Sequence, residues 1–132
     1  LGDVYKRQGL DQAISRALEQ ETKDHQDWIA RHHIVPWDKQ NAERGRDVLK
    51  KAGIDPTWDS DNLVGITYKL HWFIHNDLYV EGINLVFEGV ENYSQWMAPD
   101  NKIVLEKNVR ATLKILKGLI QSADRYLWSL LR

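Results

Sequence analysis

The sequence predicts an α+β fold, mostly α-helical, in which a small strand–strand–helix motif is flanked by N- and C-terminal helices. Three observations lead to this prediction. Apolar residues recur at helical spacing near both ends of the chain, and two short β-branched segments lie between them. A further helical segment directly follows the second β-branched segment. The length of 132 residues suits a single domain, with the motif over about residues 30–80.

The composition narrows the class of protein. The chain has no cysteine, so disulfides and thiolate metal sites are excluded, and any bound metal must use histidine or oxygen ligands. The formal net charge of −1 does not indicate a strongly basic nucleic-acid binder, although a local patch can still bind a phosphate backbone. No apolar run of about 18 residues and no signal peptide are present, so we expect no membrane partner.

The first element that the sequence predicts is a helix over about residues 10–24. Leu10, Ile14, Ala17 and Leu18 share one helical face there. We base no structure on residues 1–8, whose "LGDVYKRQ" resembles a leader found on unrelated translations. Because the chain begins with leucine, we expect it to be a fragment or a processed piece of a larger protein.

The central elements follow in order. "HHIVPW" predicts a short strand or extended segment, because Pro36 disfavours a helical conformation at the residue before it. A helix is expected over about Asn41 to Ala52, with Gly53 as its C-cap glycine. "NLVGIT" predicts a second strand, and Tyr68 to about Tyr79 a second helix.

The last third of the chain divides into two segments. Scattered glycines and a proline in "EGINLVFEGVENYSQWMAPDN" predict a loop with at most short elements. A long helix is expected over about residues 103–131, where apolar residues form a heptad-like stripe. That stripe fits a partner helix, but a terminal helix packed on its own domain is the more common case and the one we favour. Its members are Val109, Leu113, Leu116, Ile120, Ala123, Leu127 and Leu130.

Four of the five histidines fall in two short segments, as His32–His33 and His71–His75. On a helix, His71 and His75 at i and i+4 share one face and can bind one divalent ion, but this pair alone is weak evidence. Either His32 or His33 can supply a third ligand. Neighbours on a strand point in opposite directions, so the other histidine is left as a neutral imidazole suited to accept a proton.

The order of these segments resembles the HNH nucleases with the small, treble-clef-like ββα-metal fold. Within that superfamily it is most similar to the AHH nuclease group, often found as toxin tips of bacterial polymorphic toxins. The resemblance spans about residues 30–79. It is carried by "HHIVP", "NAERGRDVLKKAGID", "DNLVGIT" and "LHWFIHNDLY".

The resemblance implies a role for each matched residue. His32, His71 and His75 match the three metal ligands of the family, and His33 matches the general base that activates water. Asn62 matches the middle asparagine of the HNH name, which ties the two-stranded loop together and helps orient the base. One departure is Arg31, which stands where the AHH pattern has alanine and removes no ligand.

The implied reaction is metal-assisted hydrolysis of phosphodiester bonds, largely independent of sequence, with Arg31 and Lys69 as candidate phosphate contacts. DNA is the expected substrate and RNA the alternative. The cofactor would be one divalent ion: zinc or nickel suits histidine ligands, with magnesium and manganese as alternatives. The resemblance further implies a C-terminal toxin domain of a larger bacterial protein, delivered into a target-cell cytoplasm and bound by a cognate immunity protein.

Two other classes of function stay open at this point. In the first, metal only stabilises a non-catalytic module that binds nucleic acid or protein, and a closed site would then need Asp61 or Asp77 as fourth ligand. In the second, the chain is a helical interaction protein with structural histidines. We interpret the six tryptophans as core residues rather than base-stacking platforms.

Overall fold

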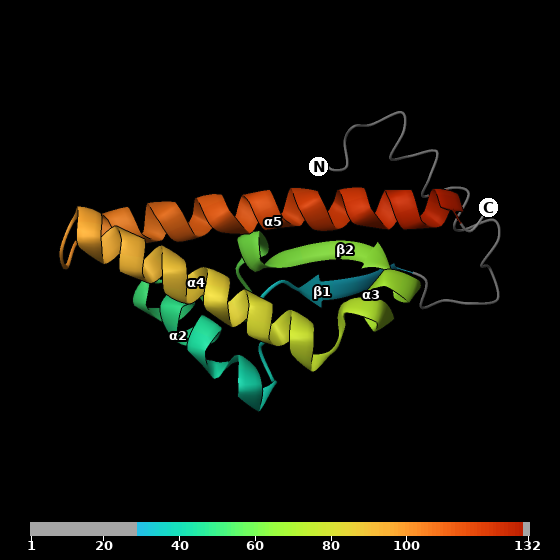
Figure 1. Ribbon diagram of the computed structural model, residues 1–132, viewed down its shortest axis with the longest axis horizontal. Helices are drawn as coiled ribbons and strands as arrows, with labels where there is room; N and C mark the ends of the chain where they lie inside the picture. The colour runs from blue at the N-terminus through green and yellow to red at the C-terminus, as the bar shows by residue number, and fades with distance from the viewer. Residues whose placement is uncertain (1–28, 131–132) are drawn as a thin grey trace.

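The computed structural model describes residues 29–130, so the helix expected over about 10–24 lies outside the described residues. Two strands and four α-helices follow one another, with two short 3₁₀ turns between them (Figure 1). The α+β, mostly helical fold class is therefore confirmed. The elements are β1 (Ile29–His33), η1 (Gln40–Ala42), α2 (Glu43–Lys51), η2 (Ser60–Asn62), β2 (Leu63–Thr67), α3 (Tyr68–Ile74), α4 (Asp77–Met97) and α5 (Lys102–Leu130).

Strands β1 and β2 form an antiparallel pair that lies beneath α5, with α3 at its end (Figure 1). The first strand starts at Ile29 and ends at His33, earlier than "HHIVPW" suggested. It ends there because the amide of Val35 donates to the Asn62 side chain instead of to a strand partner. Pairing of His32 with Val64 places both side chains on the face that packs on the core.

Helix α2 packs on the core, and it ends close to the position that the sequence predicted. Val48 and Leu49 are buried, and Gly53 has φ of +79°, a conformation that suits the C-cap glycine predicted there. Among the described residues, the buried core cluster is aliphatic apart from Phe87. Its largest fully buried members include Ile34, Leu49, Ile54, Ile66, Phe87 and Leu113.

The prediction of a loop over "EGINLVFEGVENYSQWMAPDN" is wrong. Most of this segment belongs to α4, a helix of 21 residues. Val80, Ile83 and Phe87 recur at helical spacing and are buried, which outweighs the glycines. No atom lies within 4 Å of a Cβ placed on Gly82 or Gly89, so both glycines lie in open space and lower only the helix propensity. The helix ends just before Pro99, as the restriction on the residue before a proline requires.

The helix predicted from Tyr68 to Tyr79 is also corrected, because it divides into α3 and the start of α4. His75 has φ −88° and ψ 66°, which is not helical, and Asn76 is extended. The Asn76 side chain accepts a hydrogen bond from the amide of Tyr79 at 2.9 Å and so caps the new helix. His75 is consequently the residue that ends α3 rather than a member of its last turn.

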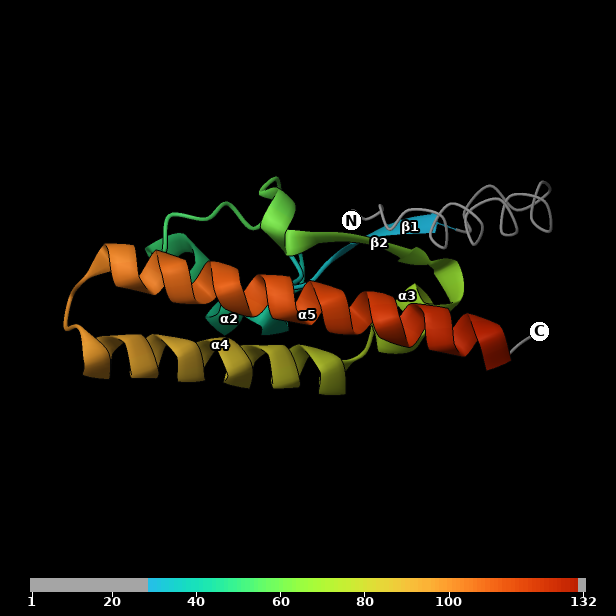
Figure 2. The same ribbon diagram turned by 90° about the horizontal axis from the view of Figure 1, so that it is seen from above.

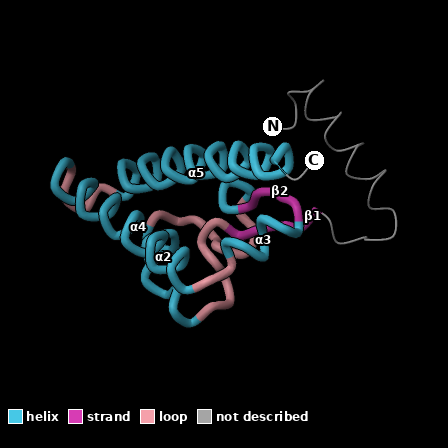
Figure 3. Tube along the Cα trace, turned by 45° about the vertical axis from the view of Figure 1, so that its right-hand side comes forward, coloured by secondary structure: helices cyan, strands magenta, loops and turns pink. Residues whose placement is uncertain are grey.

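Helices α4 and α5 lie antiparallel and side by side, joined by a short turn (Figures 2 and 3). The sequence predicted a helix over about 103–131, and α5 spans Lys102–Leu130. Its apolar stripe packs on the domain through Val109, Leu113, Leu116 and Ile120, whereas Leu130 is exposed. None of the described helices is long and apolar enough to span a bilayer.

The interpretation of the tryptophans as core residues is wrong for the four whose side chains are described. Trp37, Trp58, Trp72 and Trp96 have exposed fractions of 49%, 73%, 77% and 79%. Aliphatic residues and Phe87 already fill the core, and these tryptophans occupy loop positions or the outer sides of helices. Trp28 and the side chain of Trp128 lie outside the description.

Candidate active site

His32 is held on the inner face of β1 by a chain of two hydrogen bonds. It is 3% exposed, and its Nε2 lies 3.0 Å from the Tyr79 hydroxyl. That hydroxyl donates its single proton to the carbonyl oxygen of Ile34 at 2.7 Å. Toward His32 it is therefore an acceptor, so Nε2 carries the ring proton and Nδ1 keeps its lone pair.

The electrostatics keep this imidazole neutral. Burial, followed by repulsion from His71, His75 and His33, lowers the pKa of His32 to about 3. Burial also raises the pKa of the Tyr79 hydroxyl, so it stays protonated and can donate to Ile34. A neutral histidine with one free ring nitrogen is the form that binds a metal ion.

His71 on α3 lies next to His32, with ring centres 5.3 Å apart. Its Nδ1 is buried and has no hydrogen-bond partner among the described residues. Burial, and then repulsion from His75 and His33, lowers the pKa of His71, which also favours the neutral ring. A buried polar atom without a partner is uncommon in a folded protein and calls for a ligand or an ion.

His75 is the third histidine of the candidate site, and its ring centre lies 5.1 Å from that of His71. Imidazole nitrogens bind zinc at about 2.0–2.1 Å, so two rings that share a tetrahedral ion have centres on the order of 5 Å apart. The spacings along His32, His71 and His75 fit that value. However, no three histidine, aspartate or glutamate side chains among the described residues already stand in an arrangement that could hold a metal. His75 is exposed, so its side chain has room to turn toward the other two.

His33 points to the opposite face of β1, where it pairs with Leu63. Its Nε2 lies 3.0 Å from the carbonyl oxygen of Thr57. A carbonyl can only accept, so Nε2 donates and Nδ1 of the neutral ring is left as a proton acceptor. His33 also contributes to the lowered pKa of His32 and of His71, which places it within electrostatic reach of both.

Asn62 is fully buried and joins the two sides of the loop between the strands. Its Oδ1 accepts from the amide of Val35 at 2.8 Å, and its Nδ2 donates to the carbonyls of Val35 at 3.0 Å and Pro56 at 2.7 Å. The Pro56 carbonyl immediately precedes Thr57, which holds His33. The side chain of Asn62 thus bonds to the protein through both of its polar atoms and holds the loop that carries Thr57.

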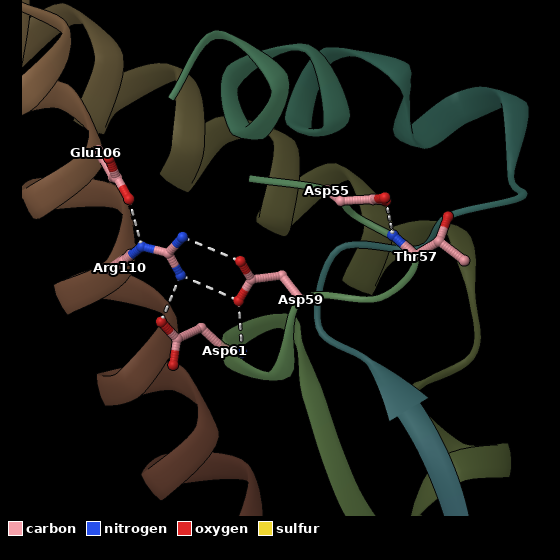
Figure 4. A network of polar contacts seen from close by, with 6 residues as sticks. All are labelled: Asp55, Thr57, Asp59, Asp61, Glu106 and Arg110. Atoms are coloured by element: carbon pink, nitrogen blue, oxygen red, sulfur yellow. Dashed lines mark hydrogen bonds and ion pairs between the residues drawn. The ribbon is translucent and has the colours of Figure 1, made fainter. Parts of the chain in front are cut away.

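Helix α5 contacts the same loop through the side chain of Arg110 (Figure 4). Its guanidinium donates to Asp59 at 3.0 Å, to Asp61 at 2.8 Å and to Glu106 at 2.8 Å. Asp59 in turn accepts from the amide of Asp61 and so caps η2. This network holds the turn that leads into Asn62, and sequence spacing did not reveal it because Arg110 lies 51 residues from Asp59.

A second contact from α5 fixes the start of α3. The carboxylate of Asp124 accepts from the amide of Thr67 at 3.0 Å and from its hydroxyl at 2.6 Å. The Thr67 side chain is the N-cap acceptor of α3, the helix that carries His71. Burial raises the pKa of Asp124. Neither Asp124 nor Tyr79 was assigned a role from sequence, because both act across more than 40 residues.

The two aspartates considered as a fourth ligand are engaged elsewhere. Asp61 is paired with Arg110, and Asp77 accepts from the side-chain amide of Asn41 at 3.0 Å. A closed four-ligand site would have to break one of these contacts. Neither aspartate is therefore free to act as a fourth ligand in this arrangement.

The two candidate phosphate contacts are exposed and form no ion pair with a described residue. Arg31 pairs with Gly65 and shares the outer face of β1 with His33. Lys69 lies on α3, two residues before His71. Arg31 therefore lies beside His33, whereas Lys69 and His71 belong to the same helix but do not share a face.

Comparison with known proteins identifies a family. A model of a nuclease family of the HNH/ENDO VII superfamily, described by its conserved AHH, matches residues 14–102. No curated protein and no solved structure matches the chain. The matched segment contains all four clustered histidines, Asn62 and Tyr79.

Proposed function

The chain belongs to the AHH nuclease family of the HNH/ENDO VII superfamily, and from this premise we propose that it is a metal-dependent endonuclease that hydrolyses DNA with little sequence preference. The observation that carries the proposal is the pair of free nitrogens on neighbouring neutral rings. His32 keeps a lone pair at Nδ1, and Nδ1 of His71 is buried without a partner.

His32, His71 and His75 would hold one divalent ion. When bound, such an ion polarises the scissile phosphate and stabilises the negative charge that develops on the leaving 3′ oxygen. The hydrogen bond from His32 to Tyr79 fixes the first ligand in the required tautomer. The all-histidine set suits zinc or nickel better than magnesium or manganese.

His33 would act as the general base. Its Nε2–H is held by the Thr57 carbonyl, which orients the ring and leaves Nδ1 to take a proton from the attacking water. The carbonyl also stabilises the imidazolium that results, because the hydrogen bond that it accepts from Nε2–H is stronger when the ring is charged. Asn62 and Arg110 keep the Thr57 loop in place through the contacts described above.

Arg31 and Lys69 would contact the phosphate backbone on either side of the scissile bond. Contacts to phosphate position a strand without reading its bases, which supports cleavage that is largely independent of sequence. The same contacts are available to RNA, which is the alternative substrate. The near-neutral net charge agrees with a few local phosphate contacts rather than a broad basic surface.

For the biological setting we propose a C-terminal toxin domain of a larger bacterial protein, delivered into a target-cell cytoplasm. A cognate immunity protein would be its partner. This part rests on the resemblance to toxin-tip nucleases. Induced expression of the wild-type chain in bacteria should stop growth, whereas expression of the His33→Ala variant should not.

The experiment that tests the nuclease is nicking of supercoiled plasmid by the purified chain. The reactions contain chelator alone, or chelator followed by zinc, nickel, magnesium or manganese in excess. His33→Ala, purified in parallel, controls for contaminating nucleases. An RNA substrate in matched reactions shows whether the chain cleaves DNA, RNA or both.

We expect nicking that requires a metal and that falls at least about a hundredfold in His33→Ala, the range that general-base catalysis contributes. Nicking that persists in His33→Ala at the wild-type rate would refute the role of His33. Absence of cleavage of either polymer with every metal would instead favour the non-catalytic, metal-stabilised module.

A further inference from the structure

Four exposed aromatic side chains belong to the segments that carry the candidate site. Their exposed fractions are 49% for Trp37, 73% for Trp58, 48% for Tyr68 and 77% for Trp72. We call these four residues the aromatic rim. The proposed function gives them no role, and the described core does not contain them.

Three members of the rim neighbour a group of the site, in space or along the chain, and Tyr68 neighbours one of these three. The ring of Trp37 lies 6.2 Å from the ring of His33. Trp58 follows Thr57, whose carbonyl holds His33. Trp72 follows His71, and it shares one side of α3 with Tyr68 because the two are four residues apart. The rim therefore has members beside His33 and members on α3, the helix that carries His71.

Single exposed apolar residues are ordinary on a protein surface, but a group of large aromatic side chains around one site marks a binding surface. The charges beside the rim indicate the kind of ligand. Arg31 and Lys69 are the neighbouring cations, and neither is paired with an acidic side chain within the described part of the chain. Aromatic faces combined with unpaired cations fit a polyanion that also presents flat, stackable rings.

We propose that the aromatic rim stacks on unpaired nucleobases, so that the substrate is single-stranded or locally unpaired nucleic acid. This inference rests on the proposed function for the identity of the polymer. In a duplex the faces of the bases are covered by their neighbours, and no aromatic side chain reaches them without unstacking. In an unpaired strand each base offers a free face, and stacking tolerates any sequence.

The test measures binding rather than cleavage. Fluorescence anisotropy follows a labelled oligonucleotide as the whole chain is added in the presence of chelator. Three probes are compared: a single DNA strand, its perfect duplex and the RNA strand of the same sequence. Because no metal and no turnover are needed, the result is independent of whether the nuclease mechanism is correct.

The variants are Trp37→Ala and Trp72→Ala, with Trp96→Ala as matched control. Trp96 has nearly the same exposed fraction as Trp72, but it lies at the end of α4 that joins the turn to α5, opposite α3 (Figure 1). Thermal unfolding verifies that all three variants are folded. Each rim variant should also lose part of the quenching of tryptophan fluorescence that accompanies binding.

We expect the wild-type chain to bind a single strand at least tenfold more tightly than the duplex. Trp37→Ala and Trp72→Ala should each weaken single-strand binding roughly tenfold, as loss of one base–aromatic stack does. Trp96→Ala should leave it within twofold. Equal affinity for strand and duplex would overturn the proposal. So would undetectable binding of every probe, or a loss in Trp96→Ala that equals the loss in Trp72→Ala.

Discussion

The substitution Tyr79→Phe isolates one hydroxyl group whose only described contacts are to the site. The hydroxyl accepts from Nε2 of His32 at 3.0 Å and donates to the carbonyl oxygen of Ile34 at 2.7 Å. Phenylalanine keeps the ring and removes both hydrogen bonds. The Ile34 carbonyl and the His32 ring lie in a buried environment, so water cannot easily replace the missing partner.

The size of the effect follows from these two contacts. Leaving a buried polar group without its partner lowers the free energy of unfolding by about 1–3 kcal/mol, so we expect a loss of about 2 kcal/mol. The second consequence concerns metal binding, because His32 is no longer held in the Nε2–H tautomer. Removal of a partner that orients a metal ligand lowers metal affinity about 10–100-fold.

Three measurements check this prediction. Chemical denaturation of the metal-free chain gives the loss of stability, and competition with a chelating dye gives the metal affinity. Nitrogen NMR of the metal-free chain reports the tautomer of His32 directly. Tyr93→Phe is the matched control, since it makes the same chemical change on a side chain that is 54% exposed. If His32 keeps the Nε2–H tautomer and the metal affinity is unchanged in Tyr79→Phe, the assignment of Tyr79 as a positioning residue is refuted.

Two further predictions concern the loop and the pH dependence. Asn62→Ala removes three buried hydrogen bonds and should lower the free energy of unfolding by at least about 3 kcal/mol. The control Asn92→Ala, at an exposed position, should change it by less than about 0.5 kcal/mol. Similar values for the two variants in denaturant titrations would contradict the structural role of Asn62. The pKa of His32 is about 3 in the folded chain against a usual value of 6.5, so below pH 6.5 the unfolded chain binds a proton that the folded chain does not. Stability of the metal-free protein should therefore fall as the pH is lowered from 6.5 toward 3, by up to about 1.4 kcal/mol per pH unit. His32→Gln should lack this part of the slope, and a pH dependence equal to that of the wild type would show that His32 is not buried as a neutral ring.

Some of the elements that carry the candidate site residues were predictable from sequence, because local pattern determines where strands and helix ends lie. A short β-branched segment bounded by turn signals predicted β2, and the Gly53 C-cap marked the end of α2. The clustering of His32, His33, His71 and His75, with Asn62 between the pairs, indicated the chemistry without any coordinates. Local pattern misled where a capping side chain competed with it, as at Asn76, and where glycines on an exposed helix face suggested a loop.

The sequence by itself determined which residue types are available for the reaction and in which order the elements carry them. Only the tertiary structure decided which nitrogen of His32 and of His33 is free, because that depends on Tyr79 and Thr57, far away along the chain. Likewise it brought Arg110 and Asp124 of α5 against the loop and against α3. It also placed Trp37 and Trp72 at the surface rather than in the core. The physical reason is that hydrogen bonds and burial join residues more than 20 positions apart, whereas helical and strand periodicity extends only to near neighbours.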